Sequence, residues 1–148
     1  MHNIYDDERL GAPTAQGMKK LRTPGEVDSA IRSSKGTMLV FVDSNCGCAA
    51  RVARPALEMA LHHRMKPGSI TTVFASTDRE ATAQARKYFT DQPPSSPAFA
   101  LLRDGKFLGM IHRAEIRTRT SEQVKQMLAE MFERFCAPGP AVLSGEPR

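Results

Sequence analysis

The hydrophobic residues of this chain fall into two patterns, short continuous apolar runs and longer stretches with the spacing of a helix face. The continuous runs predict four strands, at residues 37–43, 70–76, 98–103 and 106–112. The first run, Thr-Met-Leu-Val-Phe-Val-Asp, is typical of a central strand that is buried on both faces. The dipeptide Asp104-Gly105 separates the last two runs, which favours a tight antiparallel hairpin there.

The stretches with helical spacing predict four helices. They cover residues 23–36, 48–63, 77–90 and 120–135. Three of them open with a threonine that is followed three residues later by Glu or Gln, the sequence of a capping box; these threonines are Thr23, Thr77 and Thr120. The remaining helix contains Pro55 in its interior, which we expect to kink it, because proline cannot donate a backbone hydrogen bond.

Strands alternate with helices along most of the chain, which predicts a single α/β domain. Such alternation implies a parallel core of the sheet, and the terminal hairpin adds an antiparallel part. We therefore expect a mixed sheet with helices on both faces, formed by residues 23–136. Residues 1–22 are expected to form an irregular N-terminal arm, and residues 137–148, rich in Pro and Gly, a disordered tail.

Composition and charge narrow the possible functions. The 148 residues include 21 Lys and Arg against 16 Asp and Glu, a modest excess without a basic block that contains aromatic residues, so we expect no nucleic-acid partner. No apolar run approaches the length of a membrane span, and no membrane partner is expected. The first residues are acidic and lack the apolar core of a secretory signal, which favours a cytoplasmic location.

The chemistry of the chain centres on the sequence Cys46-Gly47-Cys48, between the first predicted strand and a helix. Unpaired N–H groups and the positive end of the helix dipole favour the thiolate form of Cys46. Gly47 allows a sharp turn that leaves the sulfur uncovered. Cys48 is close enough to attack a disulfide on Cys46, and a bridge between the two would be strained and easily reduced. Arg51 and Arg54 are candidates to lower the pKa of Cys46 further.

Two other interpretations of the cysteine pair remain open. One or both sulfurs could be buried packing residues, or they could supply half of a zinc or iron–sulfur site. The missing ligands would have to come from Cys136 or the histidines, and His62-His63 more simply complement a helix dipole. The odd number of cysteines argues against a structural disulfide framework, and we expect no bound metal.

Three residues in the last third of the chain are secondary candidates. His112 and Arg113 follow the predicted hairpin and could contact the carboxylates of a thiol co-substrate, although a solvated strand end is the simpler interpretation. Cys136 lies one residue past the apolar stripe of the last helix. We expect it to be a partly buried thiol at a helix end rather than a catalytic residue.

The order of these features resembles the thioredoxin fold. A strand leads to a cysteine at the start of a helix, Pro55 interrupts that helix, and Ser96-Pro97 precedes an antiparallel hairpin. The resemblance implies that the bond between Ser96 and Pro97 is cis and that Pro97 faces the cysteines. Gly47, Ser96 and Pro97 would then belong to the substrate groove.

A narrower resemblance is to the bacilliredoxin family, over about residues 23–136. Several separated stretches carry it in the right order, at residues 46–50, 53–56, 72–75, 95–97 and 100–102. Members of that family have a Cys-X-Cys site and are described as removing bacillithiol, a low-molecular-weight thiol, from mixed disulfides on cytosolic proteins.

The resemblance implies a thiol–disulfide oxidoreductase in which Cys46 attacks and Cys48 resolves. Bacillithiol or a similar small thiol would be the co-substrate, with no tightly bound cofactor. The partners would be S-thiolated client proteins and a thiol or reductase that recycles the site. A general disulfide reductase or isomerase is the alternative enzyme, and a metal or iron–sulfur binding module is the alternative from another class.

Overall fold

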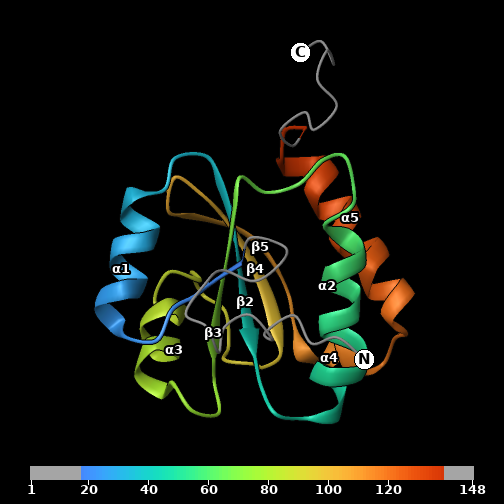
Figure 1. Ribbon diagram of the computed structural model, residues 1–148, viewed down its shortest axis with the longest axis horizontal. Helices are drawn as coiled ribbons and strands as arrows, with labels where there is room; N and C mark the ends of the chain where they lie inside the picture. Colours follow the sequence, from blue (N-terminus) through green and yellow to red (C-terminus); the bar gives the residue numbers. More distant parts are fainter. Residues whose placement is uncertain (1–17, 139–148) are drawn as a thin grey trace.

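A five-stranded mixed sheet forms the centre of the structure, a computed structural model that describes residues 18–138 (Figure 1). The strands are β1 (Met18–Lys20), β2 (Thr37–Asp43), β3 (Ser69–Phe74), β4 (Ala98–Arg103) and β5 (Lys106–Ile111), in the spatial order β1-β3-β2-β4-β5. β3 pairs in parallel with β1 and β2, whereas β4 is antiparallel to both β2 and β5. The predicted mixed sheet with an antiparallel C-terminal hairpin is thus confirmed.

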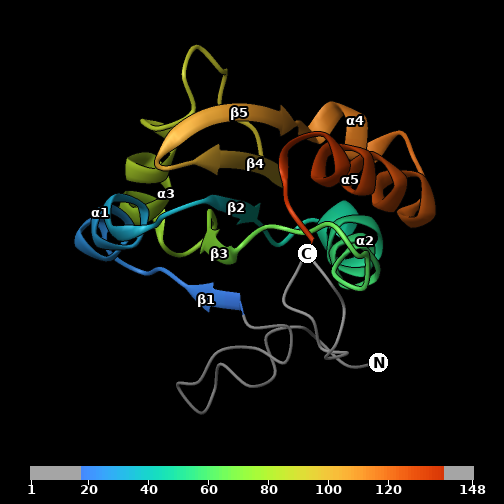
Figure 2. The ribbon, with the colours of Figure 1, turned by 90° about the horizontal axis from the view of Figure 1, so that it is seen from above.

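Helices cover both faces of the sheet, as predicted. They are α1 (Pro24–Ser33), the π-helical turn η2 (Ala49–Ala53), α2 (Arg54–Ala60), α3 (Arg79–Arg86), α4 (Arg113–Arg117) and α5 (Ser121–Phe135). α1 packs against α3 on one face, and α2 packs against α5 on the other (Figures 1 and 2). Within residues 18–138 no helix has the length and apolar character that a membrane span requires.

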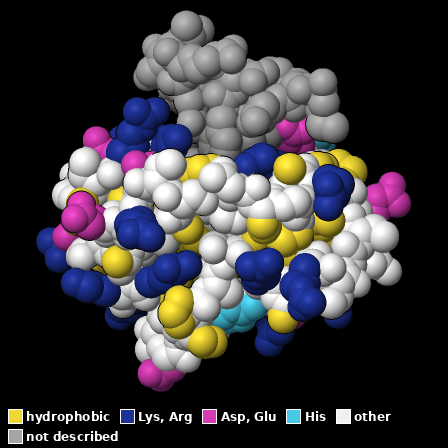
Figure 3. All heavy atoms as spheres, turned by 90° about the horizontal axis from the view of Figure 1, so that it is seen from below, with side chains coloured by type: hydrophobic (Ala, Val, Ile, Leu, Met, Phe, Trp, Pro, Cys, Tyr) yellow, Lys and Arg dark blue, Asp and Glu magenta, His cyan; other side chains and the backbone are white. Residues whose placement is uncertain are grey.

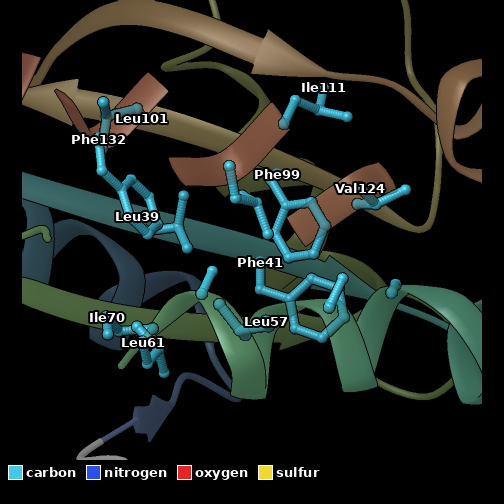
Figure 4. Packing of buried hydrophobic residues seen from close by; sticks show 14 of the residues in the cluster. Leu39, Phe41, Leu57, Leu61, Ile70, Phe99, Leu101, Ile111, Val124 and Phe132 are labelled. Carbon is cyan, nitrogen blue, oxygen red and sulfur yellow. The ribbon is translucent and has the colours of Figure 1, made fainter. Parts of the chain in front are cut away.

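The central strand β2 supplies both hydrophobic layers. Leu39 and Phe41 point toward the layer with α2 and α5, while Val40 and Val42 point toward the layer with α1 and α3. Phe41 stacks on Phe99 of β4, with ring centroids 4.7 Å apart and ring planes at 14° (Figure 4). The continuous apolar run therefore reflects burial on two sides, and it fixes the strand that leads to the cysteines.

The prediction of an irregular arm at residues 1–22 is wrong for its last part. Met18, in β1, pairs with Ile70 of β3, and both Met18 and Leu21 are fully buried. A strand of three residues is too short to produce a recognisable apolar pattern. The predicted tail is also wrong at its start, because the N–H of Lys66 donates to the carbonyl of Ala137. The remainder of both segments, 1–17 and 139–148, lies outside the described residues.

The helix after the cysteines is less regular than expected. Helical conformation begins at Gly47, widens into the π turn of η2, and ends as α2 at Ala60 rather than near residue 63. The N–H of Arg54 donates to the carbonyl of Ala49, five residues back. Pro55 follows directly and has no N–H for the next bond of the series. The disturbance expected from Pro55 thus takes the form of a wide turn in front of it.

The cap of α3 and the existence of α4 also differ from the predictions. Asp78, not Thr77, is the N-cap of α3, its side chain makes no capping bond, and the helix ends at Arg86. α4 has only five residues and was not predicted, because one turn cannot establish a helical period. By contrast, the capping box at Thr120 is confirmed in both directions, by Gln123 N–H to Thr120 Oγ1 and Thr120 N–H to Gln123 Oε1.

The substitution Leu21→Ala tests whether the segment after β1 belongs to the folded domain. Leu21 is fully buried in the layer with α1 and α3, so we expect a loss of about 2–5 kcal/mol in the free energy of unfolding. Lys19→Ala, at an exposed position of β1, should change it by less than about 0.5 kcal/mol. Urea denaturation measures the free energy of unfolding of both variants. A change in Leu21→Ala as small as that in Lys19→Ala would show that this segment adds nothing to the core.

Candidate functional site

Several loops meet at one edge of the sheet, the lower side in Figure 1. β2 and β5 both end at this edge and β4 begins there, since Val42 lies opposite Ala98 and Phe99 lies opposite Ile111. The loop with the cysteines follows β2, Pro97 immediately precedes β4, and His112 follows β5. The fold thus collects at one edge residues that are far apart in the sequence.

The two cysteine sulfurs lie next to each other at the start of the helix. The Sγ atoms of Cys46 and Cys48 are 3.0 Å apart, and Cys46 Sγ is 3.4 Å from Ser44 Oγ. Both are free thiols and both are half-buried. The N–H groups of Ala49 and Ala50 donate to the carbonyl of Cys46, so Cys46 is the residue from which the helix starts, as predicted.

The two thiols differ in acidity. Partial burial acts to raise the pKa of Cys46, but hydrogen bonds from the Cys48 thiol, the Ser44 hydroxyl and backbone N–H groups outweigh it and lower this pKa to about 7. For Cys48, burial raises the pKa, and the hydrogen bond to Cys46 and its negative charge raise it further. Near neutral pH Cys46 is therefore about half ionised, while Cys48 carries its proton.

A buried ion pair fixes the loop in front of the cysteines. Nε of Arg54 donates to Oδ2 of Asp43 at 2.9 Å, and Nη2 of Arg54 donates to the carbonyl of Ser44 at 3.1 Å. The side chain of Asp43 is fully buried and also accepts from the N–H of Ser44 at 2.8 Å. The end of β2 is thereby joined to the start of α2, and Ser44 is held between them.

Arg51 lies over the glycine of the cysteine motif. A Cβ built on Gly47 would lie 2.6 Å from Nη2 of Arg51, so any larger residue at position 47 would displace the guanidinium. The sequence suggests Arg51 and Arg54 as sources of the acidity of Cys46. Hydrogen bonds account for that acidity instead, and Arg54 is engaged by Asp43.

The loop before β4 has the predicted isomer. The peptide bond between Ser96 and Pro97 is cis, which confirms the expectation from the thioredoxin resemblance. Pro97 is buried and Ser96 is half-buried. Because Val42 lies opposite Ala98, Pro97 occupies the same edge of the sheet as the loop that carries Cys46.

The interpretation of His112 as a solvated strand end is wrong. His112 is half-buried, and its two ring nitrogens each lie 2.8 Å from an oxygen, Nδ1 from Ser95 Oγ and Nε2 from Gln92 Oε1. These bonds tie the loop before Pro97 to the end of β5. The partners are 17 and 20 residues away in the sequence, so no local pattern reveals them.

Cys136 and His63 lie away from the cysteine pair, at the ends of α5 and α2. Cys136 is 7% exposed at the end of α5, where burial raises its pKa, which confirms the expected helix-end thiol. His63, just past the end of α2, lies 3.0 Å from the carboxylate of Glu133. In residues 18–138 no three His, Cys, Asp or Glu side chains are grouped so as to hold a metal ion.

Comparison of the sequence with known proteins identifies a family to which it is similar. Residues 11–136 match the family model described as disulphide isomerase. The chain is 49% identical over 135 residues to a bacilliredoxin of Geobacillus kaustophilus, covering 91% of this chain and 92% of that protein. It is 46% identical to a bacilliredoxin of Koribacter versatilis, covering 83% of this chain and 85% of that protein.

Solved structures support the fold. Fasciola hepatica thioredoxin superposes with a TM-score of 0.55 at 18% identity, covering 76% of this chain and 98% of that one. A thioredoxin mutant from Halobacterium salinarum gives 0.57 at 14% identity, covering 88% and 100%. At such low identity these likenesses show the thioredoxin fold alone.

The acidity of Cys46 can be tested through Ser44. Alkylation of Cys46 by iodoacetamide should rise with a midpoint near pH 7, reaching about a tenth of its plateau at pH 6, because only the thiolate reacts. Ser44→Ala removes a hydrogen bond that favours the thiolate, so the midpoint should move up by about 0.5–1 pH unit. The rate below pH 7 should fall accordingly.

Ser76→Ala is the matched control for this measurement. Its hydroxyl accepts from the N–H of Asn45 in the same loop, rather than bonding to a sulfur. The midpoint should stay near pH 7 in this variant. An identical midpoint in wild type and Ser44→Ala would show that the Ser44 hydroxyl does not set the acidity of Cys46.

Proposed function

The chain belongs to the bacilliredoxin family and matches the disulphide isomerase model over most of its length, and from this membership we propose that it removes bacillithiol, or a similar small thiol, from mixed disulfides on client proteins through Cys46. Family and fold together make it a thiol–disulfide oxidoreductase. The observation that supports the finer proposal is the half-buried Cys46 thiol, with a pKa of about 7 and a second sulfur 3.0 Å away.

In the proposed first step the thiolate of Cys46 attacks the small-thiol sulfur of the mixed disulfide. The disulfide bond to the client breaks, a disulfide between Cys46 and the small thiol forms, and the client leaves as a thiolate that takes a proton from water. A pKa near 7 suits this step, because much of the sulfur is ionised at neutral pH while it keeps the nucleophilicity that a very acidic thiol loses.

In the proposed second step Cys48 or a free small thiol clears the adduct. Cys48 becomes more acidic once Cys46 carries the adduct, because the negative charge and hydrogen bond of Cys46, which raise the pKa of Cys48, are then lost. Its attack releases the small thiol and forms a disulfide between Cys46 and Cys48, which an external thiol or reductase must reduce. Attack by a second small thiol would instead regenerate Cys46 directly and release a small-thiol disulfide.

The description of the matching family model favours one alternative, a general disulfide reductase or isomerase. In that case Cys46 would attack a disulfide within or between proteins and become linked to a protein sulfur. A protein cysteine is the leaving group in both functions. They differ in the sulfur that Cys46 attacks and becomes bonded to, which belongs to a small thiol in the first and to a protein cysteine in the second.

Substitution of each cysteine tests the proposed roles. With the Cys46→Ser variant, a client protein that carries a small-thiol adduct should be reduced no faster than without enzyme. Cys48→Ser should release one equivalent of client and retain the small thiol on Cys46, because the second sulfur is absent. Cys136→Ser, at the buried third thiol, should behave as wild type and serves as the control. Mass spectrometry of both proteins over the time course gives the adduct and its position.

Two results would contradict the proposal. Retention of the small thiol on Cys48, with release intact in Cys46→Ser, would reverse the two roles. Rapid reduction of a protein disulfide, together with no release from the small-thiol adduct, would favour the general reductase.

A further inference from the structure

Two arginine side chains lie beside the cysteine pair and make no hydrogen bond or ion pair within the described part of the chain. Arg51 and Arg113 are both exposed, and neither side chain makes a hydrogen bond or an ion pair with residues 18–138. Arg54, only three residues from Arg51, is by contrast held by the buried carboxylate of Asp43. The hydrogen-bonding capacity of Arg51 and Arg113 is therefore available to a ligand.

The two arginines approach the sulfurs from different elements. Arg51 folds back over Gly47, so its guanidinium lies against the turn between Cys46 and Cys48. Arg113 is the first residue of α4, and α4 packs against η2, the turn that directly follows Cys48. The charge of Arg113 reaches the Cys48 sulfur, where it opposes the effect of burial on the pKa of Cys48.

The surrounding face carries further positive charge. Figure 3 views the molecule from the edge of the sheet where the cysteine loop lies, and Lys and Arg side chains gather there around a histidine. Hydrogen bonds rather than these charges lower the pKa of Cys46, so the arginines are not needed to activate the thiol. Binding of an anion accounts for the position of the two arginines.

We propose that Arg51 and Arg113 form a carboxylate-binding subsite, which makes Cys46 prefer small thiols that carry a negative charge. A small thiol attached to the Cys46 sulfur extends only a few bonds from it, so its carboxylate falls within reach of side chains that flank the sulfur pair. Guanidinium groups bind carboxylates through paired, charge-assisted hydrogen bonds, which gives a preference for acidic over neutral ligands. The identity of the ligand as a small thiol rests on the proposed function, whereas the preference for negative charge can be measured without it.

A pair of alkylating reagents measures the charge preference directly. Iodoacetate and iodoacetamide react alike: the thiolate attacks the CH₂ carbon, a thioether forms and iodide leaves. They differ in one negative charge. Because both require the same thiolate, the ratio of their rates on Cys46 is independent of its pKa. We expect Arg51→Gln/Arg113→Gln to lower the iodoacetate-to-iodoacetamide ratio about three- to tenfold at low salt, with smaller effects in each single variant.

Arg32→Gln is the control for net charge. Arg32 lies on α1, where it pairs with Asp28 at 4.0 Å, so its loss removes one positive charge without touching the subsite. The ratio should stay within about twofold of wild type in this variant. An unchanged ratio in the double variant, or an equal fall in Arg32→Gln, would overturn the subsite.

A matched pair of client adducts then tests the ligand. Wild type should release a client from 3-mercaptopropionate faster than from its neutral amide, and Arg51→Gln/Arg113→Gln should abolish the difference. Equal rates for the two adducts in wild type would overturn the assignment of the subsite to small thiols and leave an acidic client segment as its ligand. Failure of the proposed function gives a different result, in which neither adduct is released although the alkylation ratio still depends on the two arginines.

Discussion

The buried ion pair between Asp43 and Arg54 is the constraint on which the site depends. It joins the end of β2 to the start of α2, with the side chain of Asp43 fully buried and that of Arg54 17% exposed. A buried charge without its partner is strongly unfavourable, so loss of either residue costs about 3–5 kcal/mol. Both side chains also bond to the backbone of Ser44, which places the Ser44 hydroxyl beside Cys46. The part of the acidity of Cys46 that comes from the Ser44 hydroxyl thus depends on an interaction that does not include a cysteine.

The rest of the fold supplies a rigid support for this short loop. β2 is buried on both faces, so its end is fixed by two hydrophobic layers rather than one. The antiparallel partner β4 then brings Pro97 to the same edge, and β5 brings His112, whose ring holds the loop before Pro97. A single mobile loop would not hold two sulfurs at 3.0 Å, whereas strand ends and a helix start do so with little freedom.

Local sequence patterns were sufficient for the parts of the fold that depend on local physics. The buried strand at 37–43, the hairpin at Asp104-Gly105 and the cap at Thr120 each follow from neighbouring residues, and so does Cys46 at a helix start. β1 and α4 are too short to show a period. The partners of Arg54 and His112 depend on tertiary contacts, which one sequence does not show. The cis bond before Pro97 was expected only through the resemblance to the thioredoxin fold.

The identity of the sulfur that first carries the small thiol tests the proposed chemistry most directly. Wild-type protein would be mixed with an S-thiolated client, quenched in acid within the first turnover, and mapped by mass spectrometry. The expected species are a small-thiol adduct on Cys46 and a client with a free thiol in equal amounts. A disulfide between Cys46 and the client, or a small thiol that appears first on Cys48, would contradict the mechanism.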